Sequence, residues 1–189
     1  AGIPLYVMAG RIDQQKGIDT LLESIEQLSA LDRPIQLIIT GKVFDNELYP
    51  RLLALQEKYR GKLMLRFGFN DKLTKLYAGA DFILVPSHFE PCGLTQMEAM
   101  RFGCVPIVRH TGGLADTVPD IDEDPNGLGL KFRDDTPVAL AAALLRAERL
   151  FLQDPDRLLA IRRRGMTRDF GWPASAKRYV DFYDELLVA

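Results

Sequence analysis

The sequence has 189 residues, of which 47% are hydrophobic, and a formal net charge of −2. This length and composition predict one globular domain with a full hydrophobic core, spanning residues 1–189. A nearly neutral chain has no general attraction for nucleic acid or anionic membranes, so neither is expected as a partner. The two cysteines, Cys92 and Cys104, fit neither a zinc pattern nor a disulfide framework.

Short apolar runs alternate with segments whose apolar residues recur at helical spacing. This alternation predicts an α/β domain with a Rossmann-like, doubly wound parallel sheet. The closing segment 173–189 is expected to be a C-terminal helix. Strands are expected at 3–9, 35–39, 63–67, 82–85, 105–108 and 128–132, and helices at 18–28, 48–59, 73–79, from 92, from 114, at 137–151, 155–167 and 173–188.

The most informative stretch is 81–105, where a buried strand leads through the polar loop SHFEP into a helix. A helix that opens after a parallel strand presents unpaired N–H groups, which suit a phosphate. Gly93 permits close approach of a ligand, and Thr95 adds a hydroxyl. Glu90 is interpreted as a ligand-binding carboxylate in preference to a helix cap. Glu98, eight positions later, either binds a sugar or lies on a solvated face of the helix, and the sequence favours neither interpretation.

Other loops are expected at the same edge, because the carboxyl ends of parallel strands meet there. Arg11 and Lys16 follow the first strand and could bracket a diphosphate or be ordinary surface cations. The loop has neither G-x-G-x-x-G nor the Walker pattern. Gly41 ends the second strand. Phe69, after the third strand, either packs on a helix or stacks on a nucleobase, and packing is narrowly favoured on sequence alone.

The segment Thr111–Gly113 resembles a nest of backbone amides that would suit an anion. His88 and His110 lie in loops without an evident nucleophile or metal partner, so a hydrogen-bonding role is expected for both. Trp172 is interpreted as an aromatic anchor that fixes the last helix against the domain.

Three separated motifs occur in the order GRIDQQKG, PSHFEPCGLTQMEAM and VPIVRHTGGLADTV. They resemble bacterial glycogen synthases and plant starch synthases, which are retaining glucosyltransferases of the GT-B fold, and the similarity extends to the closing FGW segment. The resemblance implies that the chain is the C-terminal, nucleotide-sugar-binding half of such an enzyme. The N-terminal GT-B domain, with its KxGG-type loop, is absent from this chain, so the isolated domain is expected to be inactive.

The resemblance also implies roles for individual residues. Arg11 and Lys16 would contact the diphosphate and Glu90 the transferred glucose, and these three are the expected catalytic residues. Phe69 would lie against adenine, which reverses the preference for packing. The other residues expected to bind the nucleotide sugar, through backbone amides or side chains, are Gly41, Cys92, Gly93, Leu94, Thr95, Glu98, Thr111, Gly112 and Gly113.

The implied substrate is ADP-glucose and the product ADP, with no cofactor and no metal. Glucose would pass with retention to the non-reducing end of an α-1,4-glucan, bound mainly through the missing N-terminal domain. The implied compartment is cytoplasmic in a bacterium and the plastid stroma in a plant. His88 stands where the family often has arginine, and Glu98 completes a Glu-x7-Glu pattern typical of related GT-B enzymes. The alternatives are a transferase using a UDP-sugar and a non-catalytic interaction or regulatory module.

Overall fold

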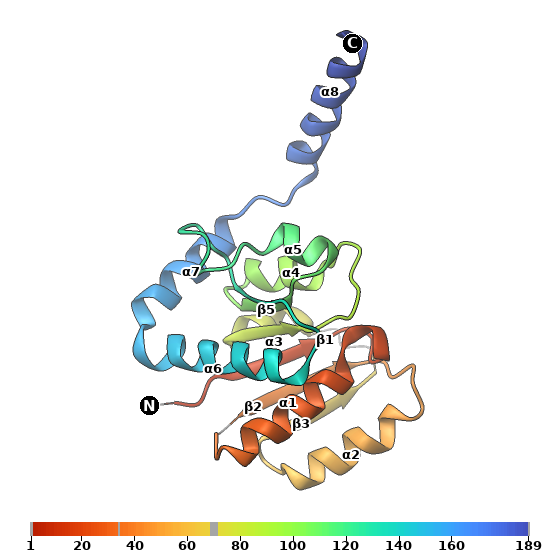
Figure 1. Cartoon of the computed structure of the whole chain (residues 1–189), viewed down its shortest axis with the longest axis vertical. Coiled ribbons are helices and arrows are strands. Elements are labelled where there is room, and N and C mark those ends of the chain that lie inside the picture. The colour runs from red at the N-terminus through yellow and green to blue at the C-terminus, as the bar shows by residue number, and fades with distance from the viewer. Residues whose placement is uncertain (1, 34, 69–71, 189) are drawn as a thin grey trace.

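The computed structural model describes residues 2–33, 35–68 and 72–188. Within them, parallel strands form one sheet in the order β3-β2-β1-β4-β5-β6 (Figure 1). This is the strand order of a doubly wound Rossmann sheet, so the predicted fold class is confirmed. The strands are β1 (Leu5–Ala9), β2 (Gln36–Gly41), β3 (Leu63–Phe67), β4 (Phe82–Val85), β5 (Val105–Arg109) and β6 (Leu130–Phe132).

Helices cover both faces of this sheet. The apolar runs predicted strands correctly because alternate residues point to opposite faces and both faces are buried. Tyr6 of β1 belongs to a core under one set of helices, and its neighbour Val7 to a second core. The first face carries α1 (Ile18–Ala30), α2 (Leu48–Lys58) and α6 (Pro137–Gln153), and the second α3 (Leu73–Gly79), α4 (Thr95–Arg101) and α5 (Gly112–Thr117).

The strand order reverses between β1 and β4, which pair in parallel at the centre of the sheet. Connections from these two strands leave toward opposite faces, so a crevice is expected at their carboxyl ends. The loop after β1, residues 10–17, and the loop after β4, residues 86–94, therefore start side by side. The topology brings together the two loops that carry the predicted catalytic residues.

Two helix starts differ slightly from the prediction. The helix α4 begins at Thr95, three residues later than expected, and α5 begins at Gly112, two residues earlier. Thr136 caps α6 by accepting a hydrogen bond from the N–H of Ala139 at 3.3 Å, with a proline in the first turn. None of the described helices is long and apolar enough to cross a membrane.

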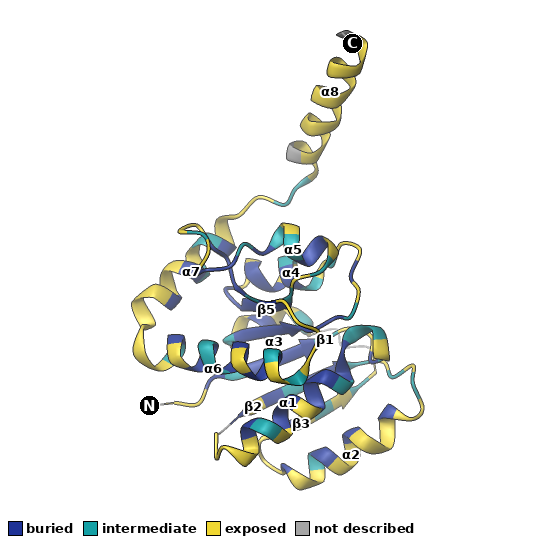
Figure 2. Cartoon of the chain, viewed as in Figure 1, coloured by how far each residue is buried: buried dark blue, intermediate teal, exposed yellow. Residues whose placement is uncertain are grey.

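The last two helices differ in whether they contact the domain body. The helix α7 (Pro155–Thr167) packs at the edge of the fold, whereas α8 (Trp172–Val188) projects away from it (Figures 1 and 2). Every described side chain of α8 is exposed, and Trp172 is 83% exposed. The prediction that Trp172 anchors this helix against the domain is therefore wrong. Amphipathic spacing shows that a helix has an apolar face but does not identify the surface that covers it.

Candidate functional site

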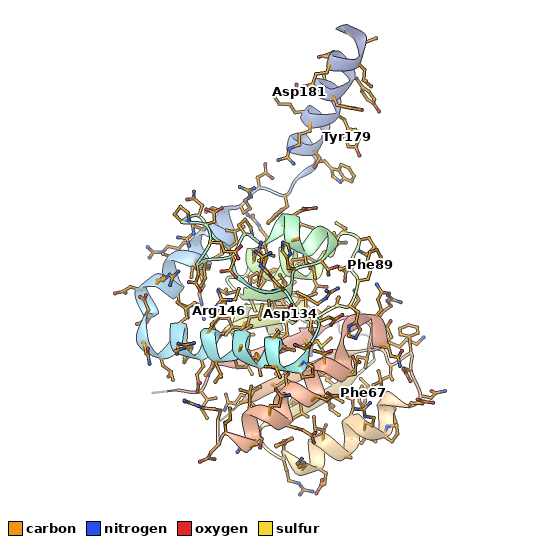
Figure 3. The ribbon with its side chains drawn as sticks, in the orientation of Figure 1. Phe67, Phe89, Asp134, Arg146, Tyr179 and Asp181 are labelled. Carbon is orange, nitrogen blue, oxygen red and sulfur yellow. The ribbon has the colours of Figure 1, made fainter. Side chains whose placement is uncertain are left out.

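The loops after β1 and β4 are locked together through backbone contacts. Gly17 adopts φ 67°, and a Cβ at this position would lie 2.1 Å from the carbonyl oxygen of Pro86. The N–H of His88 donates to the carbonyl of Gln15 at 2.9 Å, and the Gln15 side chain donates to the carbonyl of Phe89 at 3.0 Å. Figure 3 shows Phe89 at the outer side of this loop, where its ring is exposed. These contacts fix the spacing between Lys16 and the loop residues that follow Pro86.

Lys16 and Glu90 meet at this junction although they are 74 positions apart in the sequence. The Lys16 ammonium donates to Oε2 of Glu90, which also accepts a hydrogen bond from the Ser87 hydroxyl at 3.2 Å. The Glu90 side chain is only 9% exposed, whereas 21% of the Lys16 side chain is accessible. An ammonium has three donors, so Lys16 can serve an incoming phosphate while it still holds Glu90.

Arg11 lies nearer the solvent, at the rim of the same loop. Its guanidinium contacts Asp13 at 3.1 Å and Gln15 at 2.9 Å, and its side chain is 53% exposed. Asp13 in turn caps the short 3₁₀ turn Gln14–Lys16 by accepting from the Lys16 N–H. Arg11 therefore lies in the same loop as Lys16 but takes no part in the Lys16–Glu90 contact.

The two glycines after Thr111 have a packing explanation. A Cβ on Gly112 would lie 2.1 Å from the carbonyl oxygen of Glu90, and one on Gly113 would lie 2.3 Å from that of Cys92. The Gly113 N–H donates to the Glu90 carbonyl at 3.0 Å, and the Thr111 N–H donates to another backbone carbonyl. The predicted amide nest therefore has two of its three N–H groups already engaged. Of these two contacts, the one from Gly113 holds the backbone of the Glu90 loop.

The start of α4 presents backbone N–H groups. Among the described residues, the N–H groups of Gly93, Leu94 and Thr95 donate to no protein acceptor. Cys92 and Leu94 are exposed and Thr95 is half-buried. Gly93 has φ 75°, a left-handed conformation that favours glycine. The amides at this helix start are therefore available to a ligand.

Gln96 is a site residue that sequence reasoning missed. Its fully buried side chain donates to the Gly93 carbonyl at 2.7 Å and to the Thr117 hydroxyl at 3.0 Å. Thr117 continues the network by donating to the Gly113 carbonyl at 2.6 Å. Gln96 thus ties the start of α4 to α5. The available signal was the helical spacing that places Gln96 on the same face of α4 as Ala99 and Met100.

Replacing Gln96 by leucine is expected to lower the free energy of unfolding by about 1–3 kcal/mol. The volume is nearly kept, but buried partners at Gly93 and Thr117 lose their hydrogen bonds. Urea unfolding measures the change, and Gln153→Leu, at an exposed position, is the matched control. Equal stability of the two variants would contradict the assigned role of Gln96.

The remaining predicted residues lie outside this contact network. Gly41 allows the ends of β1 and β2 to approach, since a Cβ there would lie 1.6 Å from the carbonyl oxygen of Gly10. Glu98 is exposed and lines a separate groove of about 480 Å³ with Leu94 and residues of the segment 167–171. Phe69 lies outside the described residues.

His88 links three parts of the fold. Its Nε2 lies 3.0 Å from Asp19 of α1, and its Nδ1 lies 2.8 Å from Asp135, between β6 and α6. Burial lowers the pKa of His88, but hydrogen bonds to Asp135 and Asp19 and their charges outweigh burial, so the pKa is raised. The predicted hydrogen-bonding role of His88 is confirmed. His110 is exposed, and its backbone N–H donates to Phe132 at 2.8 Å.

Residues 2–161 match the family model described as "Glycosyl transferases group 1". The chain belongs to this glycosyltransferase family. The glycosyltransferase chain is 45% identical over 185 residues to a protein named glycogen synthase from Syntrophotalea carbinolica, covering 97% of this chain and 37% of that protein. A protein named glycogen synthase from Thioalkalivibrio sulfidiphilus is 43% identical over 194 residues, and the match covers 99% of this chain and 39% of that protein.

Among solved structures, the glycosyltransferase chain is similar to the catalytic domain of starch synthase IV from Arabidopsis thaliana, determined with ADP and acarbose. The TM-score is 0.85 with 30% identity, and the match covers 99% of this chain and 39% of the other. The chain thus spans less than two fifths of each of these three proteins. Within the described residues, no group of three or more His, Cys, Asp or Glu side chains is placed to hold a metal ion.

Proposed function

We propose that this glycosyltransferase domain binds ADP-glucose as the C-terminal half of a glycogen or starch synthase. The parent enzyme would transfer glucose to the non-reducing end of an α-1,4-glucan with retention of configuration. The single observation that carries the proposal is the Lys16–Glu90 contact at the crevice between β1 and β4. Sequence identity to glycogen synthases and structural likeness to a starch synthase bound to ADP support it.

The proposed chemistry follows from the charges at this edge. Lys16 and, from the rim, Arg11 would stabilise the negative charge that develops on the diphosphate as the glucosyl bond breaks. The unpaired amides at Gly93 to Thr95 would bind sugar hydroxyls or phosphate oxygens. Lys16 and Ser87 hold the Glu90 carboxylate in one orientation, so it is positioned to accept hydrogen bonds from glucose.

The described site offers no obvious covalent nucleophile, because Glu90 is already committed to Lys16 and Ser87. We therefore favour departure of the nucleotide assisted by the two cations, with the acceptor hydroxyl attacking from the same face. No metal or cofactor enters this scheme. The glucan would be held mainly by the N-terminal portion of the longer enzyme, in the cytoplasm of a bacterium or the stroma of a plastid.

Calorimetric titration of the chain with ADP and with UDP tests this proposal. We expect ADP to bind in the micromolar to millimolar range, about 4–8 kcal/mol, and UDP to bind at least about tenfold more weakly. Tighter binding of UDP would favour a transferase that uses a UDP-sugar, which the Glu90–Glu98 pattern also suits. If neither nucleotide binds at millimolar concentration, a non-catalytic module becomes the better account.

A further inference from the structure

The His88 ring lies between two carboxylates that come from different elements. Its Nδ1 is 2.8 Å from both carboxylate oxygens of Asp135, and its Nε2 is 3.0 Å from Oδ1 of Asp19. A neutral imidazole has one N–H and one lone pair, so it can donate to only one of these carboxylates. The geometry therefore fits the imidazolium, which donates from both nitrogens.

The elements joined at His88 are those that shape the candidate site. Asp19 lies in the first turn of α1, three residues after Lys16. Asp135 lies next to Asp134, labelled in Figure 3, in the loop that leads into α6. His88 itself is two residues before Glu90. The ring consequently connects the loop of Glu90 to the helix that begins after Lys16.

The guanidinium of Arg109 also faces this cluster. Arg109 of β5 donates from Nε to the Ser87 carbonyl at 2.7 Å and from Nη2 to the His88 carbonyl, and it lies 3.8 Å from Asp135. With His88 protonated, two cations balance the carboxylates of Asp19 and Asp135. With His88 neutral, the cluster carries one excess negative charge, close to where a diphosphate would bind.

We propose that protonated His88 is a positioning residue that holds the Glu90 loop against α1, so that nucleotide diphosphate binding at this edge weakens as His88 loses its proton. This inference rests on the proposed function. Loss of the proton removes one hydrogen bond to a carboxylate and adds repulsion toward an anionic ligand. Both effects weaken the binding of a nucleotide diphosphate.

The test compares the wild-type chain with His88→Arg and His88→Asn from about pH 5.5 to about pH 9, a range that spans histidine ionisation. Calorimetry measures the dissociation constant for ADP at each pH. The phosphates of ADP also titrate in this range, but the ratio of wild-type to His88→Arg dissociation constants cancels their contribution. We expect this ratio to rise about fivefold with pH, and His88→Asn to bind weakly throughout.

A second measurement uses the wild-type chain alone, so it does not depend on whether a variant folds. The sequence has only two histidines, so the His88 ring is followed by NMR in the wild-type chain. Its pKa is expected above the ordinary value of about 6.5. Because this pKa is raised in the folded state, the stability that His88 adds is complete below the unfolded value and is lost as pH rises through the folded one.

The outcomes separate the two proposals. If the wild-type chain binds ADP with the same pH profile as His88→Arg, the positioning role of His88 is overturned while the proposed function stands. If no form of the chain binds ADP, both fail. An His88 ring that titrates below the ordinary value would also overturn the role, because the ring would then be neutral between two carboxylates.

Discussion

Lys16→Ala is expected to weaken ADP binding by about 10- to 100-fold while changing adenosine binding little. Hydrogen bonds to charged groups contribute about 1.5–3 kcal/mol, and the Lys16 ammonium is the one cation in contact with Glu90 among the described side chains. Its removal also leaves the nearly buried Glu90 carboxylate with Ser87 as its remaining side-chain partner, which adds repulsion toward a diphosphate. Calorimetry with both ligands measures the effect.

The matched control for this experiment is Lys58→Ala. Lys58 also forms an ion pair, with Glu26 at 2.9 Å, but both side chains are more than half exposed and belong to α2 and α1 on the flank of the domain. Removing such an exposed pair is expected to change stability little and to leave ADP binding unchanged. Equal losses of ADP and adenosine affinity in Lys16→Ala would rule out a specific role at the diphosphate.

Gly17→Ala is expected to lower the free energy of unfolding by about 3 kcal/mol. The residue has φ 67°, and the added Cβ would lie 2.1 Å from the Pro86 carbonyl oxygen, so the two loops must move apart. Since these loops carry Lys16 and Glu90, ADP affinity is expected to fall as well. Urea unfolding and calorimetry on the same preparation measure both changes.

Gly61→Ala separates backbone strain from the steric clash. Gly61 has φ 79°, but nothing lies within 4 Å of an added Cβ. A substitution there should cost only the conformational penalty of about 1 kcal/mol. A Gly17→Ala variant no less stable than Gly61→Ala would show that the two loops are not held in close contact.

Most of the fold followed from local patterns in the sequence. Runs such as Phe82–Val85 are too short and too continuously apolar for surface helices, and their burial on both faces explains why they read clearly as strands. The edge strand β6 was also predicted, although it has only three residues. The exposed position of α8 was not predictable, because the sequence of the segment does not show which surface its apolar face contacts.

The site was partly predictable for a different reason. Parallel strands place their carboxyl ends at one edge, so topology alone predicts that Lys16 and Glu90 lie at the same edge. The Asp19–His88–Asp135 cluster could not be predicted, since its members are far apart in sequence and form no motif. Gln96 was missed because its helical spacing with Ala99 and Met100 does not by itself show that the glutamine side chain is buried.

Backbone amide NMR can map ADP-glucose binding onto the chain and so test the site most directly. We expect the largest shift changes at Lys16, at Glu90 and at the start of α4 from Gly93 to Thr95. A separate groove provides an internal comparison: it has a volume of about 270 Å³ and is lined by Arg146, Arg149 and Arg157 together with Asp122 and Asp154, among other residues. Shift changes confined to that groove, or none at saturating ADP-glucose, would contradict the assignment of the nucleotide-sugar site to the edge between β1 and β4.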